Sequence, residues 1–170
     1  MKCPACENQL EQITVSDIEV DICKGGCGGI WFDNYELKKF DKKHDSTGEE
    51  LLHIERDENI AVDYTQKRKC PKCDEIIMMR HFYSTKKEVE IDECPQCGGF
   101  WLDSGELERI RNLFENEAEK KEASKKYFSE VLKQDIAIDQ IQNESEAARI
   151  RSVSNILRFI SPSFLFSRRY

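Results

Sequence analysis

Alternating apolar and polar residues predict two short β-hairpins along the chain. Residues 12–16 and 18–22 alternate with the period of a half-buried strand, and residues 76–83 form an apolar hairpin strand farther on. After each hairpin, apolar residues recur at helical spacing, beginning with Leu37 in the first and Leu107 in the second. The pattern therefore predicts the same strand–strand–helix unit twice.

The second half of the chain has a helical pattern from Asp103 to about Ile160, which we expect to be broken once or twice. Residues 115–126 are almost without apolar side chains and place Glu before Lys at i,i+4 spacing, which predicts a solvated spacer helix. Farther on, apolar residues advance in steps of three and four, as in the narrow seam of a coiled coil. This seam consists of Ile150, Val153, Leu157, Ile160 and Phe164.

The eight cysteines fall in four pairs, two in each copy of the unit. A Cys-Pro-x-Cys precedes each hairpin, and a second pair follows it. A hairpin with a cysteine pair at each end brings four sulfurs together, which is the geometry of a zinc ribbon. Sixteen residues separate Cys6 from Cys23 and twenty separate Cys73 from Cys94, both within the range expected of zinc sites.

The alternative interpretation of a Cys-x-x-Cys pair is a thioredoxin-like redox motif. That motif occurs beside a βαβ pattern, which is not found here, so structural metal binding is favoured. The first copy departs from the second at one point, because three residues rather than two separate Cys23 from Cys27. We expect the glycines there, Gly25 and Gly26, to adopt positive φ angles and absorb the extra residue.

Two further features repeat in both copies. A tryptophan, Trp31 or Trp101, stands four residues beyond the last cysteine. It could stack on bases or anchor a partner, but packing against its own hairpin and following helix is favoured. A carboxylate pair at spacing three also repeats, and helix capping explains it better than acid–base catalysis. The pairs are Asp33 with Glu36, and Asp103 with Glu106.

Together these residues resemble the bacterial and archaeal transcription factor zinc-finger family, named for the zinc ribbon of transcription factor IIB. The motif Lys-Cys-Pro-x-Cys, a hairpin, then Cys-x-x-Cys-Gly-Gly-x-Trp-[Leu/Phe]-Asp-x-x-Glu-Leu covers residues 2–40 and 69–110. The resemblance implies two Zn²⁺ ions and says little about activity, since most members have no assigned function. The implied ligands are Cys3, Cys6, Cys23 and Cys27 for one ion, and Cys70, Cys73, Cys94 and Cys97 for the other.

We therefore expect a small α+β protein with two tandem Cys₄ zinc ribbons, each a β-hairpin plus a short helix, followed by a long helical arm. The expected divisions are a first ribbon at 1–45, a linker at 46–66, a second ribbon at 67–114 and the arm at 115–170. Each ribbon is small enough to need a metal in place of a large core.

Charge separates the arm from the rest of the chain. The formal net charge is −7, and two tetrathiolate zinc sites would make it more negative, which disfavours nucleic acid as a partner. The final 22 residues, however, contain five arginines and no acidic residue, which suggests an interaction tail. The expected partner surface joins these arginines to the apolar seam: Arg149, Arg151, Arg158, Arg168 and Arg169 with Ile150, Val153, Leu157, Ile160 and Phe164.

The function expected from the sequence is a non-enzymatic zinc-binding adaptor that contacts a protein partner or a second copy through its C-terminal helix. The family resemblance suggests a link to transcription. The alternative is a nucleic-acid-binding regulator that uses the basic residues 67–69 and the arginine tail, although a solvated face is favoured for residues 67–69. Met1 leads straight to Cys3 without a signal peptide, so we expect a cytoplasmic protein, and a membrane-surface role is disfavoured. The histidines, His44, His53 and His81, are expected at the surface or on an edge strand rather than as ligands.

Overall fold

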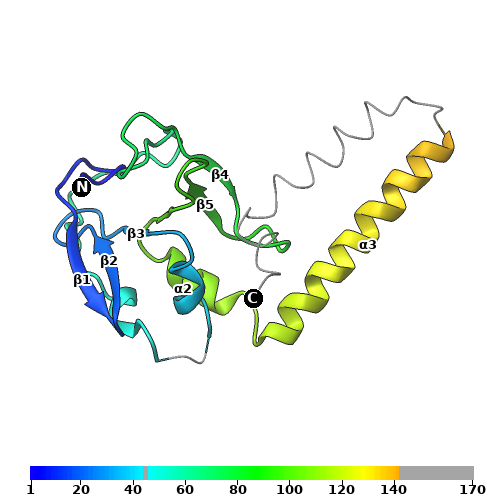
Figure 1. The fold of residues 1–170 in the computed structure, drawn as a ribbon, viewed down its shortest axis with the longest axis horizontal. Coiled ribbons are helices and arrows are strands. Elements are labelled where there is room, and N and C mark those ends of the chain that lie inside the picture. The colour runs from blue at the N-terminus through cyan, green and yellow to red at the C-terminus, as the bar shows by residue number, and fades with distance from the viewer. Residues whose placement is uncertain (44–45, 142–170) are drawn as a thin grey trace.

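Strands from both copies form one continuous antiparallel sheet in the computed structural model, which describes residues 1–43 and 46–141 (Figure 1). The sheet has six strands in the order β1-β2-β3-β6-β5-β4. The strands are β1 (Glu11–Val15), β2 (Ile18–Ile22), β3 (Ile30–Phe32), β4 (Met79–Phe82), β5 (Glu90–Glu93) and β6 (Phe100–Leu102). The small α+β fold with two ribbons is thus confirmed.

The two ribbons meet at the centre of the sheet, where β3 pairs with β6. Trp31 lies directly opposite Trp101, flanked by the pairs Ile30–Leu102 and Phe32–Phe100. The hairpins β1–β2 and β4–β5 lie on either side of this seam, so the two copies are related by an approximate two-fold axis. Neither β3 nor β6 was predicted, because three-residue strands buried on both faces show no apolar–polar alternation.

The two faces of the sheet bury different residues, since successive side chains of a strand point to opposite sides. Phe32 and Leu102 face one side, where they form an apolar core with the helices and with residues of both hairpins. Trp31 and Trp101 face the other side and pack with buried cysteines of both copies. The expectation that each tryptophan packs against its following helix is therefore wrong.

Three short helical segments cover the apolar core. They are α1 (Leu37–Phe40), the 3₁₀ helix η1 (Glu49–Leu52) and α2 (Glu106–Asn112). Their buried residues Phe40, Leu51 and Ile110 join the core. Arg111 of α2 is also buried, and its Nε donates to the carbonyl of Phe40 at 2.8 Å, which joins the helices of the two copies.

The repeated carboxylate pairs form only half of the expected helix caps. Glu36 accepts a hydrogen bond from the Asp33 amide at 2.7 Å, and Glu106 accepts one from the Asp103 amide at 2.8 Å. The aspartate side chains do not cap the helix amides, because each accepts instead from the indole of the tryptophan two residues before it. In each copy the glutamate therefore closes the turn before the helix, and the aspartate holds the tryptophan of the preceding strand.

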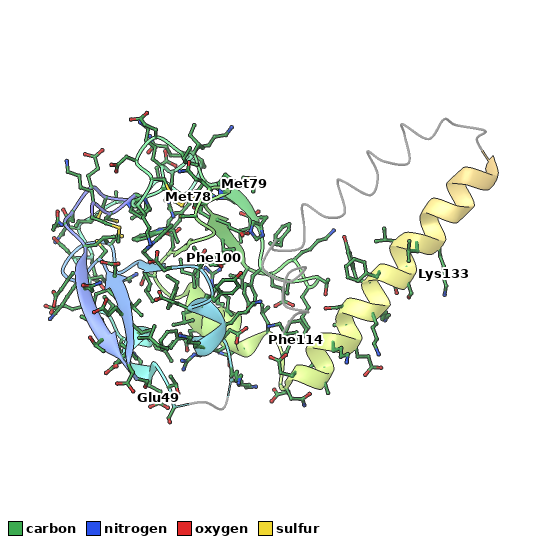
Figure 2. The ribbon with its side chains drawn as sticks, in the orientation of Figure 1. Glu49, Met78, Met79, Phe100, Phe114 and Lys133 are labelled. Carbon is green, nitrogen blue, oxygen red and sulfur yellow. The ribbon has the colours of Figure 1, made fainter. Side chains whose placement is uncertain are left out.

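The arm begins after a break at residues 113–116 and consists of helix α3 (Glu117–Ile141), which leads away from the sheet (Figure 1). Its first turn is capped by Asn116, whose side-chain oxygen accepts from the Glu119 amide at 3.0 Å. Phe114 lies where the arm leaves the body, whereas Lys133 lies far along the helix (Figure 2). No described helix is both long enough and apolar enough to cross a membrane.

Contacts from both copies hold the base of the arm. Lys120 of α3 donates to the Asp41 carboxylate at 2.9 Å, and the Tyr83 hydroxyl donates to the same carboxylate. Lys86, in the turn of the β4–β5 hairpin, donates to the Leu113 carbonyl and lies 3.1 Å from Glu119. The first turn of α3 is thus fixed to the ribbons by several charged contacts.

Candidate metal centres

The structure brings the cysteines of the first copy together into one cluster. Cys3 and Cys6 lie in a turn before β1, and Cys23 directly follows β2. The turn closes through the amide of Cys3, which donates to the Asn8 carbonyl at 2.7 Å. With Cys27, the four residues each offer a sulfur within 4.8 Å of the others.

The second copy repeats this arrangement with Cys70, Cys73, Cys94 and Cys97, whose sulfurs also lie within 4.8 Å of one another. The backbone closes each cysteine loop in the same way. The Cys23 amide donates to the Gly29 carbonyl, and the Cys94 amide donates to the Gly99 carbonyl, both at 2.9 Å. The ribbon geometry thus places a Cys₄ cluster at the same end of both hairpins.

The distances between sulfurs fit a tetrahedral zinc ion. Ligands at the usual zinc–sulfur distance of about 2.3 Å lie about 3.8 Å apart in a tetrahedron. Cys3 and Cys27 are 3.5 Å apart, Cys6 and Cys23 are 3.4 Å apart, and Cys70 and Cys97 are 3.7 Å apart. These separations are far longer than a disulfide bond, and all eight cysteines are free. Each cluster could therefore hold one metal ion.

The ionisation of the clustered thiols also fits a cation site. Sulfur contacts with Cys27 and Cys3 lower the pKa of Cys23, which favours its thiolate form. The matching contact with Cys23 raises the pKa of Cys27 to about 12. In the second cluster, burial raises the pKa of Cys97 to about 11. Four thiolates at such short range repel one another, and a divalent cation removes that penalty.

The extra residue of the first copy is absorbed as expected at Gly25, which has a φ angle of 63°. Gly26 has a different role, since a β-carbon there would lie 2.4 Å from the Cys23 sulfur. The linker supports this loop, because the Gly25 amide donates to the Glu55 carbonyl at 2.8 Å and the Asp57 amide donates to the Gly26 carbonyl at 2.9 Å. The longer loop thus gains backbone partners in the linker.

Each tryptophan of the seam lies against the cysteine loop of the other copy. A β-carbon at Gly29 would lie 2.2 Å from the Trp101 ring, and one at Gly99 would lie 2.2 Å from the Trp31 ring. Both indoles are almost completely buried, and each N–H donates to the aspartate two residues later. The glycines of the Gly-Gly-x-Trp motif are therefore needed for close approach between the two copies.

Arg68 is buried rather than solvated, which corrects the interpretation of the basic residues 67–69. Its Nη1 lies 2.7 Å from Asp103 and 3.4 Å from Asp92, and its side chain is 2% exposed. Arg80, another basic residue of the second ribbon, binds Asp92 through two nitrogens at 3.1 Å. Both arginines are therefore occupied within the protein.

Two nearby lysines also have acidic partners. Lys72 lies 2.6 Å from Asp33 of the other copy, and Lys69 lies 3.8 Å from Glu75. The basic cluster is thus largely neutralised on this face of the second ribbon.

His81 lies on the outermost strand β4, as one of the expected alternatives had it, but its side chain is buried. Its Nε2 lies 2.7 Å from the Glu93 carboxylate, and its Nδ1 lies 3.1 Å from the Phe82 carbonyl. Burial alone would lower the pKa of His81, but these two contacts outweigh it and the pKa is raised. A Glu–His pair buried across β4 and β5 was not foreseen, although His81 lies within the predicted strand at residues 76–83.

The expected partner surface, Arg149, Arg151, Arg158, Arg168 and Arg169 with the apolar seam from Ile150 to Phe164, lies outside the described residues. His44 also lies outside them. The proposal of a partner surface thus depends on the sequence alone.

Comparison with known proteins identifies the repeat. A family model described as a transcription factor zinc-finger matches residues 2–41 and 69–112. These two segments contain both cysteine clusters and all six strands. No curated protein and no solved structure matches the chain.

Proposed function

The chain is a tandem two-ribbon member of the transcription factor zinc-finger family, and from this premise we propose that it is a non-enzymatic zinc-binding adaptor. One observation carries the proposal: each cluster supplies four cysteine sulfurs to one point. A tetrahedral ion with four protein ligands has no position left for water or substrate, which is the arrangement of structural zinc. The ions then hold the ribbons in shape and take no part in a reaction.

The arm gives the adaptor its proposed means of contact. Helix α3 leaves the sheet at one end and is fixed at its base through Lys120 and Lys86 (Figure 1). The basic C-terminal residues follow it in the sequence. Residues 149–170 combine five arginines with an apolar seam, which suits a protein partner or a second copy of the chain. The family name suggests that this partner belongs to the transcription machinery.

The test removes residues 149–170 from the zinc-loaded protein and measures two properties. These are the molar mass in solution by light scattering, and the proteins captured from native lysate by a tagged chain. We expect the truncation to lose self-association or the captured partner while the metal content stays the same. An unaltered mass and an unaltered capture profile would exclude the arm as the contact surface.

A matched pair of point variants separates the seam from general charge effects. Leu157→Asp places a negative charge in the apolar seam, and Asn155→Asp places the same charge between seam positions. We expect the first variant to behave like the truncation and the second to behave like the unmodified chain. Equal behaviour of the two would argue against a helical seam.

The nucleic-acid alternative can be tested on the same material. Because Arg68 is buried, a charge reversal should be limited to Lys67 and Lys69, which avoids unfolding the second ribbon. Salt-dependent retention on DNA or RNA that Lys67→Glu and Lys69→Glu reduce would favour this alternative. Absence of binding at low salt would eliminate it.

A further inference from the structure

The glycine beside each cysteine cluster has two contacts that belong to different copies. The Gly29 carbonyl accepts from the Cys23 amide and closes the first cysteine loop. The α-carbon of the same residue faces the Trp101 ring, where even a methyl group would not fit. Thus Trp101 of the second ribbon packs on backbone whose position depends on the first cluster.

The reverse contact has the same geometry. The Gly99 carbonyl closes the second cysteine loop, and its α-carbon faces the Trp31 ring of the first ribbon. A second point of contact lies one residue earlier, where Gly28 approaches Ser104 and Gly98 approaches Asn34. Each cysteine loop is therefore covered at two successive residues by the other ribbon.

The burial of both tryptophans makes these contacts energetically important. Trp31 is 1% exposed and Trp101 is 0% exposed, although each belongs to a ribbon with only a thin core of its own. A loop without its metal has no reason to keep the shape that receives the opposite indole, because zinc binding and folding are one process in such small sites. Loss of the ion at one cluster should therefore expose the tryptophan of the other ribbon, which packs on the loop of that cluster.

We propose that the two metal centres are coupled, so that an ion bound at one raises the affinity of the other, and that Trp31 and Trp101 act as positioning residues for the opposite centre. This inference rests on the zinc binding proposed above. Coupling of this kind is reciprocal: the first ion must strengthen the second site by the same factor as the second strengthens the first. The metal content of the protein then changes mainly between none and two ions.

The experiment measures Co²⁺ affinity on the full chain, reduced and free of oxygen, at one fixed pH, from the absorbance of the cobalt thiolate complex. One variant disables the second centre with Cys94→Ser and Cys97→Ser, and its mirror disables the first centre with Cys23→Ser and Cys27→Ser. We expect the remaining centre to bind Co²⁺ at least tenfold more weakly than it does in the intact chain. The loss of affinity at the first centre when the second is disabled should equal the loss at the second centre when the first is disabled.

A second variant keeps all eight ligands and changes the contact between the two ribbons. Gly99→Ala displaces Trp31 of the first ribbon from the second cysteine loop, so the coupling predicts a weaker first centre although all four ligands of that centre are unchanged. The control is Gln96→Ala, in the second cysteine loop itself, because the Gln96 side chain is exposed and is not a ligand. We expect the control to leave the factor between the centres unchanged.

The outcomes separate this inference from the proposed function. If each centre binds within tenfold of its intact affinity when the other is disabled, or if Gly99→Ala leaves the first centre unaffected, the coupling is overturned and zinc binding stands. If the intact chain binds no metal, both are overturned. Native mass spectrometry of the intact chain at half-saturating Zn²⁺ adds a direct check, since coupling predicts that species with one ion are fewer than species with none or two.

Discussion

At the scale of single residues, equivalent polar groups of the two copies have different hydrogen-bond partners. Asp103 accepts from Trp101 and from Arg68, whereas Asp33 accepts from Trp31 and from Lys72 of the other copy. The same carboxylate thus has a buried partner in one ribbon and a half-exposed partner in the other. Such differences show that the copies have separate electrostatic surroundings despite their common backbone.

The buried pair of His81 and Glu93 makes stability depend on pH. The folded-state pKa of His81 lies above its ordinary value of 6.5, so its contribution is fully present below pH 6.5 and is lost as the pH rises through the raised value. We expect His81→Gln to cost about 1–3 kcal/mol at acidic pH and progressively less at higher pH. The free energy of urea unfolding of the zinc-loaded proteins, measured across this range, checks the difference.

The free energy of unfolding of the variant is subtracted from that of the unmodified protein at each pH. This difference cancels the pH dependence of zinc binding, which is common to both proteins. Arg80 and Asp92, which pair with each other on the opposite face of β4 and β5, are unchanged in the comparison. A stability difference that stays constant, or that grows as the pH rises, would contradict the assignment of a charged His81.

At the scale of elements, the arm depends on contacts made at its base. The Asp41 carboxylate is 5% exposed and receives Lys120 of α3 together with the Tyr83 hydroxyl. These residues come from the end of α1, from the arm and from the end of β4. One buried carboxylate therefore joins both ribbons to α3.

We expect Lys120→Met to loosen the first turns of α3 because, among the described residues, it leaves the Asp41 charge with Tyr83 as its remaining partner. The loss should be about 1–3 kcal/mol of local stability. Hydrogen exchange of residues 117–124 measures it directly. Lys121→Met is the matched control, since that side chain is exposed on the same turn, and equal exchange in the two variants would rule out this role of Asp41.

The elements also show where sequence reasoning succeeded and where it failed. The hairpin of β1 and β2 and the four cysteine pairs have clear local signals, namely alternation and spacing, and the structure has them where they were expected. The seam between β3 and β6 has no local signal, since three buried residues show no period. The available clue was the Gly-Gly-x-Trp motif, which occurs in both copies. A glycine at the same place in each copy indicates that another part of the chain approaches the backbone closely there. The burial of Arg68 depends on Asp92 and Asp103, which only the folded sheet brings near it.

At the scale of the whole molecule, both ribbons share the apolar core beneath the helices. Val20 and Ile22 of the first hairpin and Val89 and Ile91 of the second belong to one buried cluster. Neither ribbon therefore has a separate core that would stand when the other unfolds.

We expect a chelator to unfold both ribbons together while part of α3 stays helical. The ribbons depend on their ions, whereas α3 is a 25-residue helix whose side chains at 117–133 are exposed or half-buried. Hydrogen exchange after chelation should show loss of protection throughout residues 1–112 with residual protection within 117–141. Ribbons that keep their protection in excess chelator would contradict a structural role for the metal.

The joining of two ribbons in one chain also fixes the proportions of any larger assembly. In a symmetric pair of separate ribbons, both ribbons would have the same surroundings. Here the second ribbon continues into α3, whereas the linker binds the cysteine loop of the first ribbon. The protein therefore offers one arm for every two cysteine clusters. A complex of intact chains would therefore have a metal content twice its number of arms, whether it is built through the arms or through the edges of the sheet.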